Sequence, residues 1–133
     1  MNILIIDDRR FLRLANERAL VRAGHHVFTA SDGEEGLRLA RERIPDLVIL
    51  DMMLPKLSGQ QLLHELRADP QTSTMPVMVL TSLPQCNEEK LKNEGATSYY
   101  QKSLLQLDKG TAHFMQAVEQ LLARTAARAA SAS

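Results

Sequence analysis

An α/β domain with a doubly wound, five-stranded parallel sheet is the fold that this sequence predicts. Short runs rich in Val, Ile and Leu alternate along the chain with longer amphipathic segments, a pattern typical of strands joined by helical crossovers. The short runs are apolar on both faces, as strands covered by helices on both sides of a sheet are. The chain of 133 residues is long enough for one well-packed domain.

The predicted strands occupy four strongly apolar runs and a weaker fifth. They are residues 2–6 (NILII), 25–30 (HHVFTA), 46–50 (DLVIL), 76–80 (PVMVL) and 97–100 (TSYY). The fifth run is supported by its two tyrosines, because aromatic residues favour strands. Right-handed crossovers between successive parallel strands then place helices on both faces of the sheet.

Helices are predicted after each strand. They cover residues 9–23, a segment between a cap at Ser31 or Asp32 and Pro45, and residues 58–68, 88–94 and 110–124. Helical spacing gives four of them an inward stripe. The stripes are Leu12, Ala15, Ala19 and Ala23; Leu37 and Ala40; Leu62, Leu63 and Leu66; and Phe114, Val118, Leu121 and Leu122.

The composition indicates an ordinary cytoplasmic globule. Sixteen basic residues balance sixteen acidic ones, so no global field favours direct binding of nucleic acid or an anionic membrane. No apolar run approaches the roughly 18 residues of a membrane span, and the single Cys86 cannot form an internal disulfide. We expect a domain over residues 1–124 and an Ala/Ser/Arg-rich tail over 125–133, either a frayed helix or disordered.

Polar side chains follow the predicted strands at their carboxyl ends. Asp7 and Asp8 follow the first strand and Asp51 follows the third. Thr81 follows the fourth strand, and Lys102 comes just after the fifth. Because the carboxyl ends of parallel strands meet at one edge of the sheet, where ligands bind in such folds, we expect these side chains to converge there.

Three carboxylates at one edge repel one another, by on the order of 4 kcal/mol for each close ionised pair at a near-surface dielectric. The ammonium of Lys102 and a divalent cation are the compensating charges that we identify. Oxygen-only ligands favour Mg²⁺, and the Thr81 hydroxyl can donate to a phosphoryl oxygen. The set predicts a carboxylate that accepts a phosphoryl group. Each residue taken alone is more often an ordinary turn, helix-cap or strand-end residue.

Four motifs together resemble the receiver domain of two-component response regulators. They are IIDD (5–8), VILDMMLPKLSG (48–59), VLTS (79–82) and GATSYYQK (95–102). The resemblance covers about residues 2–122 and implies the flavodoxin-like receiver fold. It also implies a signalling protein with at most weak autophosphatase activity, and not an enzyme.

The resemblance assigns the chemistry of the site. Asp51 is implied to be the phosphoacceptor, which takes the phosphoryl group from a histidine kinase or a histidine phosphotransfer protein. Pro55 and Gly59 are implied to shape the loop that follows it. The implied Mg²⁺ ligands are Asp7, Asp8, Asp51 and the backbone carbonyl of Met53.

The resemblance also implies a switch and a docking surface. Thr81 and Lys102 contact the phosphoryl group, and Thr81 and Tyr99 carry the switch to a partner-binding face. Phe11, Leu14 and Val21 lie on one stripe of the first helix, which is either part of a wide buried face or a docking patch for the kinase next to the acidic site. In the second case we expect Phe11 and Leu14 to make the contacts.

One position departs from the family pattern. Receivers usually have a proline after the lysine, preceded by a cis peptide bond, and Ser103 stands there in this chain. A cis bond before a residue other than proline costs about 2.5–4 kcal/mol. We predict a cis Lys102–Ser103 bond.

The leading functional hypothesis is a single-domain response regulator that switches a protein partner, as a monomer or a phosphorylation-dependent dimer. A phosphorelay intermediate and a phosphorylation-independent binding module are the alternatives. A phosphatase of the haloacid dehalogenase class would need an aspartate at the position of Met53. A nucleotide or flavin carrier would need a Gly-rich or hydroxyl-rich loop where the chain has DDRRF.

Overall fold

The structure, a computed structural model, describes residues 1–52, 56–81, 95–101 and 115–125, apart from the side chains at positions 12, 81 and 99–101. In this part of the chain, five parallel strands form one sheet in the order β2-β1-β3-β4-β5. The strands are β1 (Asn2–Ile6), β2 (His26–Ala30), β3 (Leu47–Asp51), β4 (Val77–Thr81) and β5 (Ser98–Gln101). Each boundary lies within one residue of the prediction.

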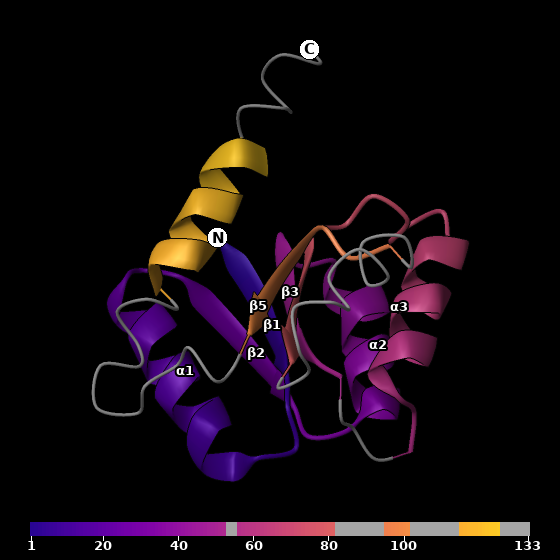
Figure 1. Ribbon diagram of the computed structural model, residues 1–133, viewed down its shortest axis with the longest axis horizontal. Coiled ribbons are helices and arrows are strands. Elements are labelled where there is room, and N and C mark those ends of the chain that lie inside the picture. The colour runs from indigo at the N-terminus through magenta and orange to yellow at the C-terminus, as the bar shows by residue number, and fades with distance from the viewer. Residues whose placement is uncertain (53–55, 82–94, 102–114, 126–133) are drawn as a thin grey trace.

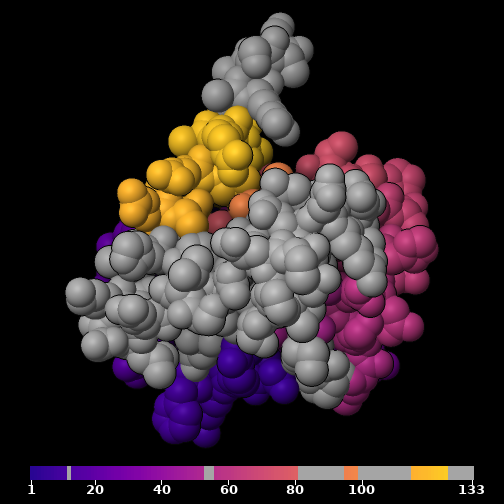
Figure 2. All heavy atoms as spheres, in the orientation of Figure 1, coloured from indigo at the N-terminus to yellow at the C-terminus, as the bar shows by residue number. Residues whose placement is uncertain are grey.

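Helices cover both faces of the sheet (Figure 1). One face carries α1 (Arg10–Arg22) and a helix over residues 115–125, and the other carries α2 (Gly33–Arg43) and α3 (Gly59–Ala68). In the space-filling view (Figure 2), residues 115–125 and α3 lie on opposite sides of the molecule. The predicted doubly wound fold is therefore confirmed, while the helix expected at 88–94 lies outside the described residues. No helix within the described ranges is both long and apolar enough to cross a membrane.

Alternate residues of the central strands pack into two separate hydrophobic cores, one on each face of the sheet. Leu4 and Ile6 of β1 face α2 and α3, where the stripe Leu62, Leu63 and Leu66 is fully buried. Ile3 and Ile5 face the other way, into the core completed by Leu20 of α1 and by Val118, Leu121 and Leu122. Burial on both faces explains why these strands read as continuous apolar runs.

Two predictions about burial are wrong. In α1 the predicted stripe contains Ala15 and Ala23, which are exposed, whereas Asn16 and Leu20 are buried. The helix turns its larger leucine inward because burying leucine removes more apolar surface from water than burying alanine does. The strand β2 is only partly buried, because it is an edge strand with β1 as its one neighbour.

Side chains cap the two helices that flank the site. The Asp32 carboxylate accepts a hydrogen bond from the backbone N–H of Glu35 at 2.8 Å and caps α2. Ser58 and Gln61 form a reciprocal capping box at the start of α3. These caps fix where each helix begins relative to the carboxyl edge of the sheet.

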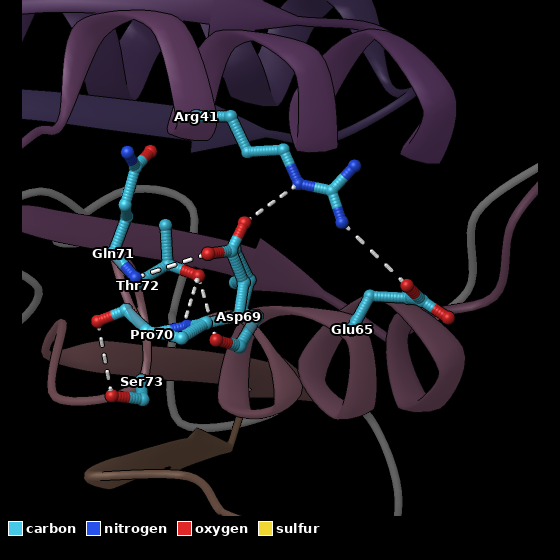
Figure 3. A network of polar contacts seen from close by, with 8 residues as sticks. Arg41, Glu65, Asp69, Pro70, Gln71, Thr72 and Ser73 are labelled. Atoms are coloured by element: carbon cyan, nitrogen blue, oxygen red, sulfur yellow. Dashed lines mark hydrogen bonds and ion pairs between the residues drawn. The ribbon is translucent and has the colours of Figure 1, made fainter.

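An arginine joins α2 to α3 on the outer surface (Figure 3). Arg41 Nε lies 3.2 Å from Asp69 Oδ2, and Arg41 Nη2 lies 3.6 Å from Glu65 Oε2. Asp69 Oδ1 also accepts from the backbone N–H of Gln71 at 3.0 Å, and the buried Thr72 hydroxyl donates to Leu66 O at 2.6 Å. The turn after α3 is thus fixed by a hydrogen bond to α3 itself and by an ion pair to α2.

A second arginine, Arg67, joins the turns that precede β4 and β5 at the amino edge of the sheet. The half-buried Arg67 donates from Nη1 to the carbonyls of Ser73 at 3.0 Å and Met75 at 2.6 Å, in the turn before β4. Its Nε donates to Gly95 O at 2.8 Å, just before β5. The Thr97 hydroxyl oxygen lies 3.4 Å from Arg67 Nη2 and accepts from the backbone N–H of Val77. Arg67 therefore holds the starts of β4 and β5 together.

Candidate functional site

The candidate site lies where the strand order reverses. The strand β1 has β2 on one side and β3 on the other, so the crossovers leave β1 and β3 in opposite directions. Folds with this strand order bind ligands beyond the carboxyl ends of the strands at that point. Ile6 lies opposite Leu50 in the β1–β3 register, so Asp7 and Asp51 emerge from the sheet side by side.

Three carboxylates meet there. One oxygen each from Asp7, Asp8 and Asp51 lies within 4.8 Å of the others. Asp7 and Asp51 are 0% and 1% exposed, whereas Asp8 is exposed. Two buried carboxylates at the rim and a third open to solvent form an oxygen-only donor set, which fits a hard divalent cation such as Mg²⁺. The structure therefore brings together the acidic residues that the sequence singled out.

Two arginines follow the aspartate pair and hold it. Arg9 donates its backbone N–H to Asp7 Oδ1 at 2.9 Å, and its side-chain Nε lies 3.6 Å from the same oxygen. Arg9 Nη2 lies 3.6 Å from Asp51 Oδ2. Arg13 Nη1 donates to the backbone carbonyl of Asp7 at 2.7 Å. Sequence reasoning missed Arg9, although its place two residues after Asp7, between a strand end and a helix, was a signal for it.

A search against protein families identifies this arrangement. The model of the response regulator receiver domain matches residues 3–127, nearly the whole chain. The chain belongs to this family. Membership makes this chain a signalling domain rather than a classical enzyme.

Individual relatives agree with this family and show how much of each protein is shared. The probable transcriptional regulator ycf27 of Guillardia theta is 46% identical over 81 residues, which are 61% of this chain and 31% of that protein. Protein PilH of Pseudomonas aeruginosa is 36% identical over 101 residues, which are 75% of this chain and 84% of PilH. The chain thus spans well under half the length of several regulators that it matches, but most of the length of PilH.

A solved receiver gives the same fold. The response regulator receiver domain protein from Clostridium thermocellum has a TM-score of 0.81 and is 30% identical, over 99% of this chain and 98% of that one. The two chains are therefore alike in fold over nearly their whole length.

Close backbone packing shapes the receiver's loop after Asp51. A Cβ added to Gly59 would lie 2.6 Å from Met52 Cα, and one added to Gly33 would overlap the carbonyl oxygen of Leu57. Lys56 adopts a left-handed φ of 68°, and its Nζ lies 3.6 Å from Asp32 Oδ2. The loop is therefore pressed against the start of α2 through Leu57 and Lys56, and Gly59 packs against the backbone of Met52. Pro55 lies outside the described residues.

Several predicted residues of the receiver site cannot be placed. Met53, Lys102 and Ser103, with the predicted cis bond, lie outside the described residues. Only the backbone is described for Thr81 and Tyr99. Thr81 lies opposite Gln101 in the β4–β5 register, so the residue before Lys102 is beside the end of β4.

The predicted docking residues lie on α1. Phe11 is 88% exposed in the first turn, and Leu14 is half-buried. The expectation that both belong to one wide buried face is therefore wrong for Phe11. A single exposed apolar side chain is common on protein surfaces, but its exposure leaves Phe11 accessible to a partner, as a docking residue must be.

Proposed function

We propose that this receiver is a stand-alone response regulator whose Asp51 accepts a phosphoryl group in the presence of Mg²⁺. The observation that carries the proposal is the meeting of three carboxylates within 4.8 Å, two of them buried, at the point where the strand order reverses. The match to 84% of PilH supports a regulator that consists of little more than the receiver.

In the proposed reaction, a carboxylate oxygen of Asp51 attacks the phosphorus of a phosphohistidine on a histidine kinase or phosphotransfer protein. A P–O bond to Asp51 forms, the P–N bond breaks, and the imidazole leaves with the bonding pair and takes up a proton. Burial keeps Asp51 in one orientation and largely away from bulk water. Bound Mg²⁺ supplies neutralisation of the charge on the phosphoryl oxygens.

The remaining residues take the roles that receivers give them. Asp7 and Asp8 hold the metal with Asp51, and the carbonyl of Met53 completes the protein ligands. Thr81 donates to the phosphoryl group, and Lys102 pairs with it. The shift of Thr81 lets Tyr99 turn inward, which changes the face around β5 that a protein partner binds. In the β4–β5 register, the backbone of Thr81 lies opposite Gln101 and that of Tyr99 lies opposite Val79, on the same pair of strands.

Intact-mass analysis after incubation with acetyl phosphate tests the proposal. With Mg²⁺ we expect the wild-type chain to gain one phosphoryl group, and with EDTA to gain none. Asp51→Asn should gain none under either condition. Asp46→Asn, which changes an exposed carboxylate at the other end of β3, should behave as wild type.

A failure of wild type to gain mass under any condition would contradict phosphoacceptance and favour a phosphorylation-independent binding module. If the gained group moves on to a histidine phosphotransfer protein, the chain acts as a phosphorelay intermediate.

Kinase docking through α1 is the second part of the proposal. Phe11 is exposed in the first turn of α1, the helix that begins just after Asp7 and Asp8, and Leu14 lies one turn further along the helix. With a histidine kinase that phosphorylates wild type, Phe11→Ser should lower the rate of phosphoryl transfer by about tenfold, since exposed aromatic anchors dominate such interfaces. The reaction with acetyl phosphate should be unchanged.

Val21→Ser is the matched control, because Val21 is a 53% exposed apolar residue in the last turn of the same helix. Equal losses in Phe11→Ser and Val21→Ser, or a loss with acetyl phosphate as well, would contradict docking through Phe11.

A further inference from the structure

Arg9 places a positive charge against both buried carboxylates of the site. Its Nη2 lies 3.6 Å from Asp51 Oδ2, and its Nε lies 3.6 Å from Asp7 Oδ1. The carboxylate side chains are 2% and 0% exposed, while the Arg9 side chain is 50% exposed. The guanidinium therefore lies on the solvent side of the two aspartates and bridges β1 to β3.

A divalent cation would need oxygens of the same two carboxylates. Both a metal ion and a guanidinium lower the repulsion between Asp7 and Asp51, and both act through the oxygens of these carboxylates. Asp7 Oδ1 already accepts the backbone N–H of Arg9 at 2.9 Å, which fixes that oxygen where the side chain reaches it. The charge of Arg9 and the charge of Mg²⁺ are thus alternatives at the same carboxylates.

The contacts of the Arg9 side chain are of a kind that breaks easily. At 3.6 Å they are longer than the roughly 2.7–3.2 Å of a hydrogen bond. Half of the side chain is already in water, so only the other half has to be uncovered when the guanidinium leaves. Its backbone N–H remains bonded to Asp7 whatever the side chain does.

We propose that Arg9 is a displaceable internal cation, which holds the acidic cluster of the metal-free receiver together and withdraws when Mg²⁺ binds. Because the two cations compete for the same carboxylates, Arg9 weakens Mg²⁺ binding and sets the Mg²⁺ concentration at which the site is ready for phosphoryl transfer. The inference rests on the Mg²⁺ site of the proposed function.

The chain contains a matched control for this role. Arg10, the first residue of α1, is exposed, and among the described residues no ion pair joins it to a carboxylate. Arg9→Met and Arg10→Met remove the same net charge within one residue of each other. Only Arg9→Met removes the charge that touches Asp7 and Asp51.

Isothermal titration with MgCl₂ measures the competition directly and needs no phosphodonor. We expect Arg9→Met to bind Mg²⁺ about three- to tenfold more tightly than wild type, in line with a pair of partly exposed ionic contacts. Arg10→Met should change the dissociation constant by less than about twofold, because an exposed charge further away is screened. Arg9→Lys should lie closer to wild type than Arg9→Met does.

Thermal unfolding gives the second reading. In EDTA, Arg9→Met should unfold at a lower temperature than Arg10→Met, because only Arg9→Met removes a positive charge that offsets the repulsion between the two buried carboxylates. Saturating Mg²⁺ should remove that difference.

The Mg²⁺ titration distinguishes a failure of this inference from a failure of the proposed function. Equal Mg²⁺ affinities in wild type and Arg9→Met, or equal tightening in Arg9→Met and Arg10→Met, would overturn the role of Arg9 and leave the metal site standing. A lack of Mg²⁺ binding in wild type and in Arg9→Met alike would overturn the proposed metal site and the inference with it.

Discussion

The two edges of the sheet are each held by an arginine, and the two arginines are held in opposite ways. At the carboxyl edge, the Arg9 guanidinium lies 3.6 Å from each of two buried carboxylates. At the amino edge, Arg67 donates to backbone carbonyls at distances as short as 2.6 Å, and no carboxylate pairs with it among the described residues. One contact is ionic and long, and the other is a set of short hydrogen bonds.

The difference means that the hydrogen bonds of Arg67 are permanent, whereas the ionic contacts of Arg9 can be replaced. Burial without a neighbouring anion lowers the pKa of Arg67 from its ordinary value, but a guanidinium remains charged at neutral pH. Its hydrogen bonds satisfy carbonyls that water would otherwise have to reach. Arg9 instead balances charge, which a metal ion can balance equally well. The amino edge therefore keeps one geometry, while the carboxyl edge can exchange one cation for another.

The largest expected effect tests the hydrogen bonds of Arg67 at the amino edge of the sheet. Arg67→Met keeps an apolar side chain of similar length but leaves several carbonyls before β4 and β5 without their donor. We expect the free energy of unfolding to fall by about 3 kcal/mol, measured by urea denaturation. Arg67→Lys, with one point charge in place of the fork, should recover only part of the loss. A stability equal to that of wild type in Arg67→Met would contradict the fastening role.

A smaller effect tests the packing of Gly33 against the loop after Asp51, at the carboxyl edge of the sheet. Gly33 lies directly beneath the carbonyl oxygen of Leu57, in the loop that follows Asp51. Gly33→Ala should lower the free energy of unfolding by about 2 kcal/mol, because backbone cannot move aside as a flexible side chain does. Gly24→Ala is the comparison, since a Cβ there meets open space and only its positive φ of 95° opposes the change. A smaller loss in Gly33→Ala than in Gly24→Ala would show that the loop adapts freely.

The smallest expected effect concerns a second ion pair, Asp32–Lys56, whose atoms are as far apart as those of the Arg9 contacts. Asp32 and Lys56 are also 3.6 Å apart, but the pKa of Asp32 is lowered chiefly by its hydrogen bond from the Glu35 backbone, with Lys56 adding to this. Because the folded-state pKa lies below the unfolded value of about 3.8, the ionised carboxylate stabilises the fold above that pH. This stabilisation is lost as the pH falls through the folded-state pKa.

Thermal unfolding of wild type and Asp32→Asn between about pH 7 and pH 3 measures this effect. Asn still caps α2 but carries no charge. The advantage of wild type should be small at pH 7 and should shrink toward the acid end. An advantage that grows on acidification would contradict the assignment.

The sequence predicted the strands best, because burial on both faces leaves an unambiguous apolar run. Leu47 to Leu50 are fully buried, and Asp51 emerges where that run ends. The amphipathic α1 was harder, since alanines at helical spacing read as an inward stripe while the tertiary packing turned Leu20 inward instead. Spacing identifies candidate faces, but the packing partners decide among them.

The arginines show what a pattern of residues leaves out. The aspartates could be predicted because their positions at strand ends follow from the topology. The contacts of Arg9 and Arg67 depend on where long side chains reach across elements distant in sequence, as Arg67 does to Gly95. Such contacts have no fixed spacing, so only the folded structure reveals them.

Identification of the phosphorylated residue tests the central claim most directly. After reaction with acetyl phosphate and Mg²⁺, borohydride reduces an aspartyl phosphate to homoserine, and trypsin can release residues 44–56 as one peptide between Arg43 and Leu57. Fragmentation of that peptide should locate homoserine at position 51 and unchanged aspartate at position 46. Homoserine at any other position, or an unmodified peptide from a chain that has gained a phosphoryl group, would contradict the assignment of Asp51 as the phosphoacceptor.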